Sequence, residues 1–162
     1  MAKKITAGGL VLGGTITDTD TQYTRDRYEE VRAMEPCTAA QLTAWRNDTA
    51  LSELVLFTGD CGVQRVTVRA EDLVGENGGR ISGEHICLTY LKSTLAYDGY
   101  PGYGNRNPPP PVTRDNRKES VDILYQPAGE EKDLAARTVQ PVWVSISVPS
   151  NRTIQKLACV DN

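Results

Sequence analysis

The sequence has few of the side chains on which enzymes most often rely. Among its 162 residues there is one histidine, His85, and there is no G-x-S-x-G motif and no C-x-x-C pair. A hydrolase triad needs a serine on a strained turn, and structural zinc sites need closely paired cysteines or histidines. His85 adjoins Ile86 in an apolar stretch, where a partly buried structural histidine is the commonest role. We therefore expect no catalytic residue, no metal site and no cofactor in this chain.

A dominant charge and long apolar runs are also missing. The net charge is −3 and the basic residues are scattered, which disfavours binding to nucleic acid. No apolar run approaches the ~20 residues of a membrane helix. The opening MAKKITAGGLVLGG has only Leu10, Val11 and Leu12 as an apolar core, whereas a secretory signal needs about 7–15 such residues. We expect no membrane span, and an intracellular location unless an export signal has been removed.

The acidic residues include three adjacent pairs, Glu29-Glu30, Glu71-Asp72 and Glu130-Glu131. Glycoside hydrolysis uses two carboxylates on one bond, but neighbouring side chains of an extended chain point to opposite faces. Asp18 and Asp20 lack the glycine and the distal glutamate of a calcium loop. We interpret all of these as solvated surface charges.

The four cysteines are widely spaced, at Cys37, Cys61, Cys87 and Cys159, so three disulfide pairings stay open. Cysteine packs as a small hydrophobe. We therefore expect buried or partly buried free thiols ahead of disulfides, and disulfides ahead of metal ligation.

Apolar residues alternate over short segments separated by Gly-, Asn- and Asp-rich turns, which is typical of β-strands. The predicted strands cover Ala39–Trp45, Leu51–Phe57, Val63–Ala70, His85–Lys92, Val121–Gln126 and a last segment within 138–153. Val63 is out of phase with Val66, which indicates a bulge at Gln64-Arg65. Glu29–Met34 and Leu134–Ala136 each predict one helical turn. The pattern predicts an all-β fold, an antiparallel β-sandwich of immunoglobulin-like or jelly-roll-like type with long loops.

The composition divides the chain into three parts. We expect a loop-rich, extended lead-in over 1–35, the β-sandwich domain over 36–149, and a C-terminal tail over 150–162. A long irregular loop is predicted over 93–120, and loops of that length are usually functional or disordered.

That loop holds the one group of residues suited to binding. Tyr97, Tyr100 and Tyr103 are separated by glycine and proline, and tyrosine rings can stack on sugars while their hydroxyls hydrogen-bond. We name these three tyrosines as the candidate carbohydrate-binding residues. The structural alternative is that the rings pack over the end of the sandwich. Further along, Pro108–Pro111 favours polyproline II and could contact a protein partner.

The clearest alternation lies in TVQPVWVSISVPSNRT, residues 138–153. Val142, Val144, Ile146 and Val148 share one parity, and Trp143, Ser145 and Ser147 share the other. This pattern predicts a strand with one buried face. We expect the strand to lie at an open sheet edge that the tail or another chain covers.

Several of these segments together resemble a known family. LTAWRNDTALSELVLFTGDCGVQRVTVRAEDL is similar to the N-terminal β-sandwich of glycosidases related to glycoside hydrolase family 123, through Trp45-Arg46 and through Val66-Thr67-Val68 up to Leu73. RYEEVR, RISGEHICLTYLKST and RTVQPVWVSISVPSN resemble the segments around it. The resemblance spans roughly residues 25 to 153. Asn47-Asp48 replaces the usual Gly-Glu, and IQKLACVDN replaces the expected Pro-Gly-x-Tyr-x-Gly turn.

The resemblance implies a non-catalytic β-sandwich that supports or extends a downstream catalytic domain in a secreted or periplasmic bacterial protein. In the family, the catalytic Asp-Glu pair belongs to a TIM barrel, which nothing here matches, so no catalytic residue carries over. Two other hypotheses stay open. One is an independent carbohydrate-binding module that uses the three tyrosines. The other is an assembly domain that contacts a protein through the proline run or binds another copy of the chain at the open edge.

Overall fold

The computed structural model describes residues 11–75, 79–97 and 117–150. In chain order its elements are β1 (Leu12–Thr17), η1 (Arg25–Arg27), α1 (Tyr28–Ala33), β2 (Thr49–Thr58), β3 (Val63–Val66), β4 (Leu73–Val74), β5 (Arg80–Ile81), η2 (Gly83–His85), β6 (Ile86–Tyr97), β7 (Arg117–Pro127), β8 (Lys132–Leu134) and β9 (Val139–Ser147). None of the helices in these ranges is long and apolar enough to cross a membrane.

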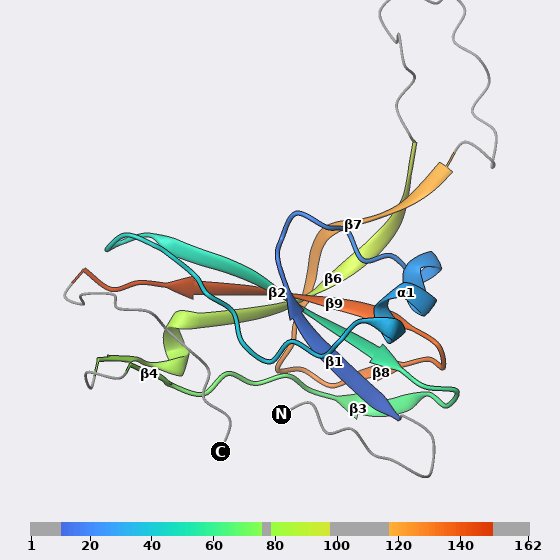
Figure 1. The fold of residues 1–162 in the computed structure, drawn as a ribbon, viewed down its shortest axis with the longest axis horizontal. Coiled ribbons are helices and arrows are strands. Elements are labelled where there is room, and N and C mark those ends of the chain that lie inside the picture. Colours follow the sequence, from blue (N-terminus) through green and yellow to red (C-terminus); the bar gives the residue numbers. More distant parts are fainter. Residues whose placement is uncertain (1–10, 76–78, 98–116, 151–162) are drawn as a thin grey trace, which may run out of the picture.

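One five-stranded sheet organises the molecule. Its strand order is β1-β2-β9-β6-β7, and every neighbouring pair is antiparallel. Two small two-stranded ribbons, β3-β8 and β4-β5, accompany this sheet. The predicted all-β fold of antiparallel strands is therefore confirmed, and α1 is the only α-helix among the described residues (Figure 1).

The core lies on both faces of the sheet, because residues of β2 alternate between them. On one face Val55 and Phe57 pack against residues that include Tyr28 and Val31 of α1. On the other face Leu56 packs with residues of β3, β6, β8 and β9. A further cluster joins Ala50 of β2 with residues of β5 and β9 on this second face. The sheet is therefore the middle layer between α1 and the two ribbons.

Strand β9 occupies the centre of the sheet, which makes the prediction of an open edge at Val142–Val148 wrong. β9 pairs with β2 on one side and with β6 on the other. The alternation itself is confirmed, since Val142, Ile146 and Val148 are buried and Trp143 is partly exposed. Side chains alternate perpendicular to the sheet, whereas strand neighbours lie within its plane. A half-buried pattern therefore says nothing about how many strands flank it.

Two predicted irregular regions contain strands. The lead-in holds β1, an edge strand that pairs with β2. The predicted loop over 93–120 is shortened at both ends, because β6 runs to Tyr97 and β7 begins at Arg117. This hairpin continues beyond the point where β9 accompanies β6. It carries polar residues such as Ser93, Thr94 and Glu119, so its sequence lacks the alternation of a half-buried strand.

Other segments differ in detail. Ala39–Trp45 is not a strand, although Leu42 and Ala44 pack as irregular chain against the third core cluster. Leu134 belongs to β8 instead of a helical turn. The helical turn at Glu29–Met34 is confirmed as part of α1.

The predicted bulge is confirmed as well. The pairing of β3 with β8 shifts register between Val63 and Val66. Arg65, inside the bulge, has a φ of 53°, a left-handed conformation that favours the extra residue of a bulge. Strand β3 ends at Val66, four residues before the predicted end at Ala70.

Candidate functional site

Of the three tyrosines of the predicted carbohydrate-binding site, only Tyr97 falls within the described residues. The backbone of Tyr97 ends β6, whereas Tyr100 and Tyr103 lie outside the described residues, as does Pro108–Pro111. The binding role of the tyrosines therefore stays a prediction.

The acidic residues interpreted above as solvated surface charges are exposed, except Asp72, which is partly buried. Glu29 pairs with Arg137, and Asp72 pairs with Arg80. Within residues 11–75, 79–97 and 117–150, no cluster of three or more His, Cys, Asp or Glu side chains could hold a metal ion. His85 is exposed in η2, so the partly buried strand position expected for it is wrong.

The described cysteines also differ from expectation. Cys37, Cys61 and Cys87 are free thiols, and all three are exposed. The prediction of free thiols is confirmed for these three, but their predicted burial is wrong. Cys159 lies outside the described residues.

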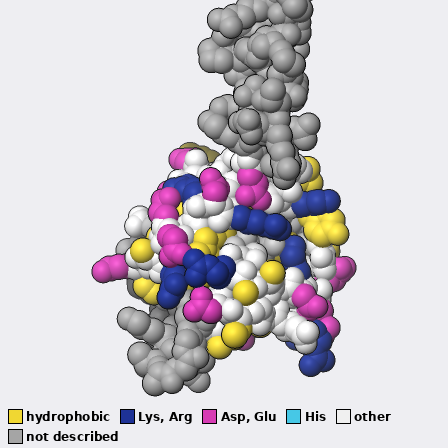
Figure 2. Space-filling model, turned by 90° about the vertical axis from the view of Figure 1, so that its right-hand side faces the viewer, with side chains coloured by type: hydrophobic (Ala, Val, Ile, Leu, Met, Phe, Trp, Pro, Cys, Tyr) yellow, Lys and Arg dark blue, Asp and Glu magenta, His cyan; other side chains and the backbone are white. Residues whose placement is uncertain are grey.

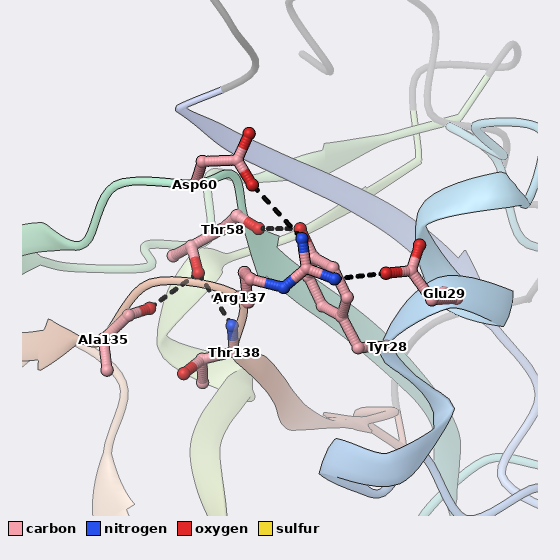
Figure 3. A network of polar contacts seen from close by, with 7 residues as sticks. All are labelled: Tyr28, Glu29, Thr58, Asp60, Ala135, Arg137 and Thr138. Carbon is pink, nitrogen blue, oxygen red and sulfur yellow. Dashed lines mark hydrogen bonds and ion pairs between the residues drawn. The ribbon is translucent and has the colours of Figure 1, made fainter.

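A polar network fixes α1 to the loops at the ends of β2 and β8 (Figure 3). The Tyr28 hydroxyl donates to the Thr58 carbonyl at 2.9 Å, and the Thr58 hydroxyl donates to the Ala135 carbonyl at 2.6 Å. Arg137 lies with its guanidinium carbon 4.8 Å from the Tyr28 ring centroid. It also pairs with Asp60 at 3.2 Å and with Glu29. The hydrogen bond to Asp60 and the charge of Glu29 raise the pKa of Arg137.

The contacts of this network hold α1 against the sheet and leave few groups free to bind a ligand. Arg137 has a φ of 51°, and its backbone N–H donates to Gly59 at 2.9 Å. The guanidinium is thus held by two carboxylates and an aromatic ring, leaving it engaged on several sides. We assign the network a structural role.

A cleft opens where β6 separates from β9. The two strands pair only from Ile86↔Ile146 to Tyr90↔Val142, after which β6 and β7 diverge from β9 (Figure 1). Gln140 spans the gap, and its side-chain amide donates to the carbonyls of Leu91 and Pro141, both at 2.8 Å. The cleft has a volume of about 270 Å³.

Basic side chains from three distant segments line this cleft: Arg25, Lys92 and Lys132. The Lys132 ammonium lies 4.9 Å from the ring centroid of Tyr90 and 5.5 Å from that of Tyr125. The Lys92 ammonium lies 5.0 Å from the same Tyr125 ring. Burial lowers the pKa of Lys132, and the positive charges of Arg25 and Lys92 lower it further.

Two acidic residues, Glu119 and Asp133, also line the cleft. Glu119 accepts a hydrogen bond from the backbone N–H of Arg25 at 3.1 Å and pairs with its side chain at 3.8 Å. Asp133 accepts from the backbone N–H of Arg65 at 2.9 Å. Figure 2 views this end of the molecule and shows acidic and basic side chains side by side. Both carboxylates have partners, so they are poorly placed to act as a free acid and base on a glycosidic bond.

Sequence reasoning missed this cleft. Arg25, Lys92 and Lys132 belong to separate segments, and none stands in a motif. The only local signal was the position of Lys92 within a predicted strand next to Leu91. They converge only in the folded chain, where the charges of Arg25 and Lys92 both act on Lys132.

A buried carboxylate lies on the same face of the sheet as α1. Glu53 of β2 is 3% exposed, and its Oε1 atom has no hydrogen-bond partner. Its cross-strand neighbours are Thr17 and Trp143. Burial, and secondarily the charge of Asp18, raises the pKa of Glu53 to about 7.

A solvent-exposed tryptophan marks the end of the sheet where β9 finishes. Trp45 is 82% exposed and opens a turn in which Asn47 has a φ of 61°. The turn is fixed to the chain after β9, because Asn47 N–H donates to Val148 and Val148 N–H donates to Asp48, both at 2.9 Å. Trp45 is therefore presented by a hydrogen-bonded turn.

Comparison with known proteins identifies the family of this chain. Among curated proteins nothing matches the chain. Among solved structures, a family 123 glycoside hydrolase from Clostridium perfringens, described in a study of glycolipid glycan hydrolysis, matches with a TM-score of 0.67 and 25% identity. The match covers 88% of this chain but only 22% of that enzyme. The family model of the glycoside hydrolase 123 N-terminal domain matches residues 16–154. The chain therefore belongs to the glycoside hydrolase 123 N-terminal domain family.

Proposed function

We propose that this chain is a non-catalytic domain that supports the catalytic part of a longer family 123 glycoside hydrolase. The observation that carries the proposal is coverage: the chain corresponds to a small share of a related enzyme. The chemistry of the described residues agrees with it. The acidic groups of the cleft are engaged with backbone and side-chain partners, and Glu53 is only 3% exposed.

The support would act through the end of the sheet that carries Trp45. Tryptophan is the side chain most enriched among the energetic anchors of interfaces, and one ring can bury about 150–250 Å². The turn that Trp45 opens is hydrogen-bonded to Val148, just after β9, through Asn47 and Asp48. We assign the catalytic part of the longer glycosidase as the occupant of the Trp45 surface, because Trp45 is a large apolar side chain that is exposed near the end of β9.

An activity assay tests the non-catalytic part of the proposal. The purified chain is incubated with glycolipid glycans, and released sugar is measured by chromatography. We expect no release, because hydrolysis needs two carboxylates on either side of one bond. Sugar release that scales with the concentration of this chain would overturn the proposal.

A stability comparison tests the docking surface. Trp45→Ala is introduced into this chain alone and into a longer glycosidase that contains it. The isolated chain should keep its Tm, whereas in the longer protein the unfolding transition of this domain should fall by a few degrees, since about 1 kcal/mol corresponds to about 2–4 °C for a domain of this size. Leu124→Ala, which removes an exposed side chain from β7, is the matched control. Equal effects of Trp45→Ala in both proteins would contradict docking there.

The three-tyrosine site remains a separate prediction. Calorimetric titration of glycans tests it, with Tyr97, Tyr100 and Tyr103 all replaced by alanine in the comparison protein. Binding that survives the triple replacement would remove these residues from consideration.

A further inference from the structure

Three basic side chains line the cleft between β6 and β9, and only one of them, Arg25, forms an ion pair with a described residue. Among the described residues, the recorded ion pairs include neither Lys92 nor Lys132. Arg25 has one acidic partner, Glu119, at 3.8 Å. The charged neighbours that most affect Lys132 are both positive. Two ammonium groups therefore lie near one aromatic ring, and neither forms an ion pair with a carboxylate in the described part of the chain.

Aromatic rings stabilise the two neighbouring ammonium groups of Lys92 and Lys132 but do not neutralise their charge. Lys92 and Lys132 both lie over the ring of Tyr125, at 5.0 and 5.5 Å from its centroid. The negative face of an aromatic ring attracts a cation, and the attraction grows as water is excluded. Lys132 is additionally placed over the buried ring of Tyr90. The rings therefore attract the two ammonium groups without cancelling their charge.

The cleft also supplies space and neutral hydrogen-bonding groups. Its volume of about 270 Å³ lies just below the ~300–1,000 Å³ of typical small-molecule sites. Ser93 and Thr138 line it together with the apolar side chains of Leu91 and Val139. Fixed cations, hydroxyls and an apolar wall in one concavity are the features that orient a small polar ligand.

We propose that this cleft binds the oxyanion group of a small ligand, with Lys92 and Lys132 as its charged contacts. A carboxylate on an acidic monosaccharide and an inorganic or esterified phosphate offer the same chemistry to two ammonium groups. The acidic residues Glu119 and Asp133 limit the site to one compact anion, because a longer polyanion would meet their charges. The site is independent of the supporting role and requires no catalytic step.

Titration of the purified chain tests the site. The probes are N-acetylneuraminic acid, inorganic phosphate and neutral N-acetylgalactosamine, each followed by calorimetry and by chemical-shift changes of backbone amides. We expect saturable binding of at least one anionic probe with a dissociation constant of about 1 mM or tighter. Affinity should fall as salt is raised, because the contacts are screened. Phosphate alone would identify a phosphate group as the ligand, and the sugar acid alone would identify a carboxylate.

Charge-removing variants locate the binding. Lys132→Gln and Lys92→Gln should each weaken it about tenfold or more, since each removes a charge-assisted hydrogen bond. Arg69→Gln removes one positive charge from an exposed position outside the cleft lining, and its affinity should match the parent chain. Thermal unfolding of each variant confirms that it is folded. Three outcomes would overturn the proposal: no saturable anion binding, equal binding of the neutral sugar, or equal weakening by all three variants.

Discussion

The hydroxyl of Tyr28 donates a hydrogen bond of 2.9 Å to the backbone carbonyl of Thr58, joining α1 to the last residue of β2. Tyr28 is 5% exposed and Thr58 is fully buried. The bond therefore lies in the core, where an unmade hydrogen bond is expensive. This hydrogen bond fixes the position of α1 on the sheet.

Replacing Tyr28 by phenylalanine should lower the free energy of unfolding by about 1–2 kcal/mol, because the buried carbonyl of Thr58 loses its donor. Urea unfolding measures the change. Tyr125→Phe is the matched control, since Tyr125 is 57% exposed and keeps its ring under Lys92. An equal loss in both variants would mean that the hydrogen bond is not responsible.

The stability of the chain should depend on the protonation of Glu53. Burial raises its pKa from 4.5 to about 7, so the folded protein binds a proton more tightly than the unfolded chain. The free energy of unfolding should consequently fall as pH rises through this window. The fall contributed by Glu53 should reach about 3 kcal/mol, at 1.36 kcal/mol for each pKa unit.

Glu53→Gln should remove that fall and give the more stable protein at about pH 8, because an amide carries no charge to desolvate. Urea unfolding at several pH values between about 4 and 8 measures both profiles. Glu84→Gln, at an exposed residue of η2, should keep the parent profile. Parallel profiles for Glu53→Gln and the parent would contradict the assignment.

Gly13 of β1 should not tolerate a side chain. A Cβ atom there would lie 2.7 Å from Cε2 of Phe57 and would also clash with its Cζ atom. Gly13→Ala should destabilise the chain by about 1–3 kcal/mol, the usual range for overpacking. At Gly129 nothing lies within 4 Å of the added atom, so Gly129→Ala should change stability little. Thermal unfolding of the two variants makes the comparison, and similar Tm values would count against close packing at Gly13.

The exposed thiols should react in the folded state. Cys37, Cys61 and Cys87 are free and exposed, and access controls modification as much as thiolate character does. A maleimide reagent should modify all three without denaturant, with the sites identified by mass spectrometry of peptides. Modification of these residues only after unfolding would show that they are protected.

The sequence alone determined several of the strands that carry core residues. The alternation in Val142–Val148, the apolar run Leu51–Phe57 and the phase shift at Gln64-Arg65 each correspond to a feature of the structure. The strand predicted at Ala39–Trp45 is wrong, because Leu42 and Ala44 pack against the core as irregular chain. The arms of β6 and β7 escaped prediction because they extend beyond the core and carry polar residues.

Only the tertiary structure decided which strands are neighbours, and with that the position of every candidate site. Side-chain alternation reports the direction perpendicular to a sheet, whereas strand order is set by hydrogen bonds within its plane. For this reason the alternation of β9 could not reveal that β2 and β6 flank it. The same in-plane order places Trp143 beside Glu53, whereas packing of the β3-β8 ribbon against the sheet brings Lys132 of β8 to Lys92 of β6. These residues are far apart in sequence, so folding alone makes them a site.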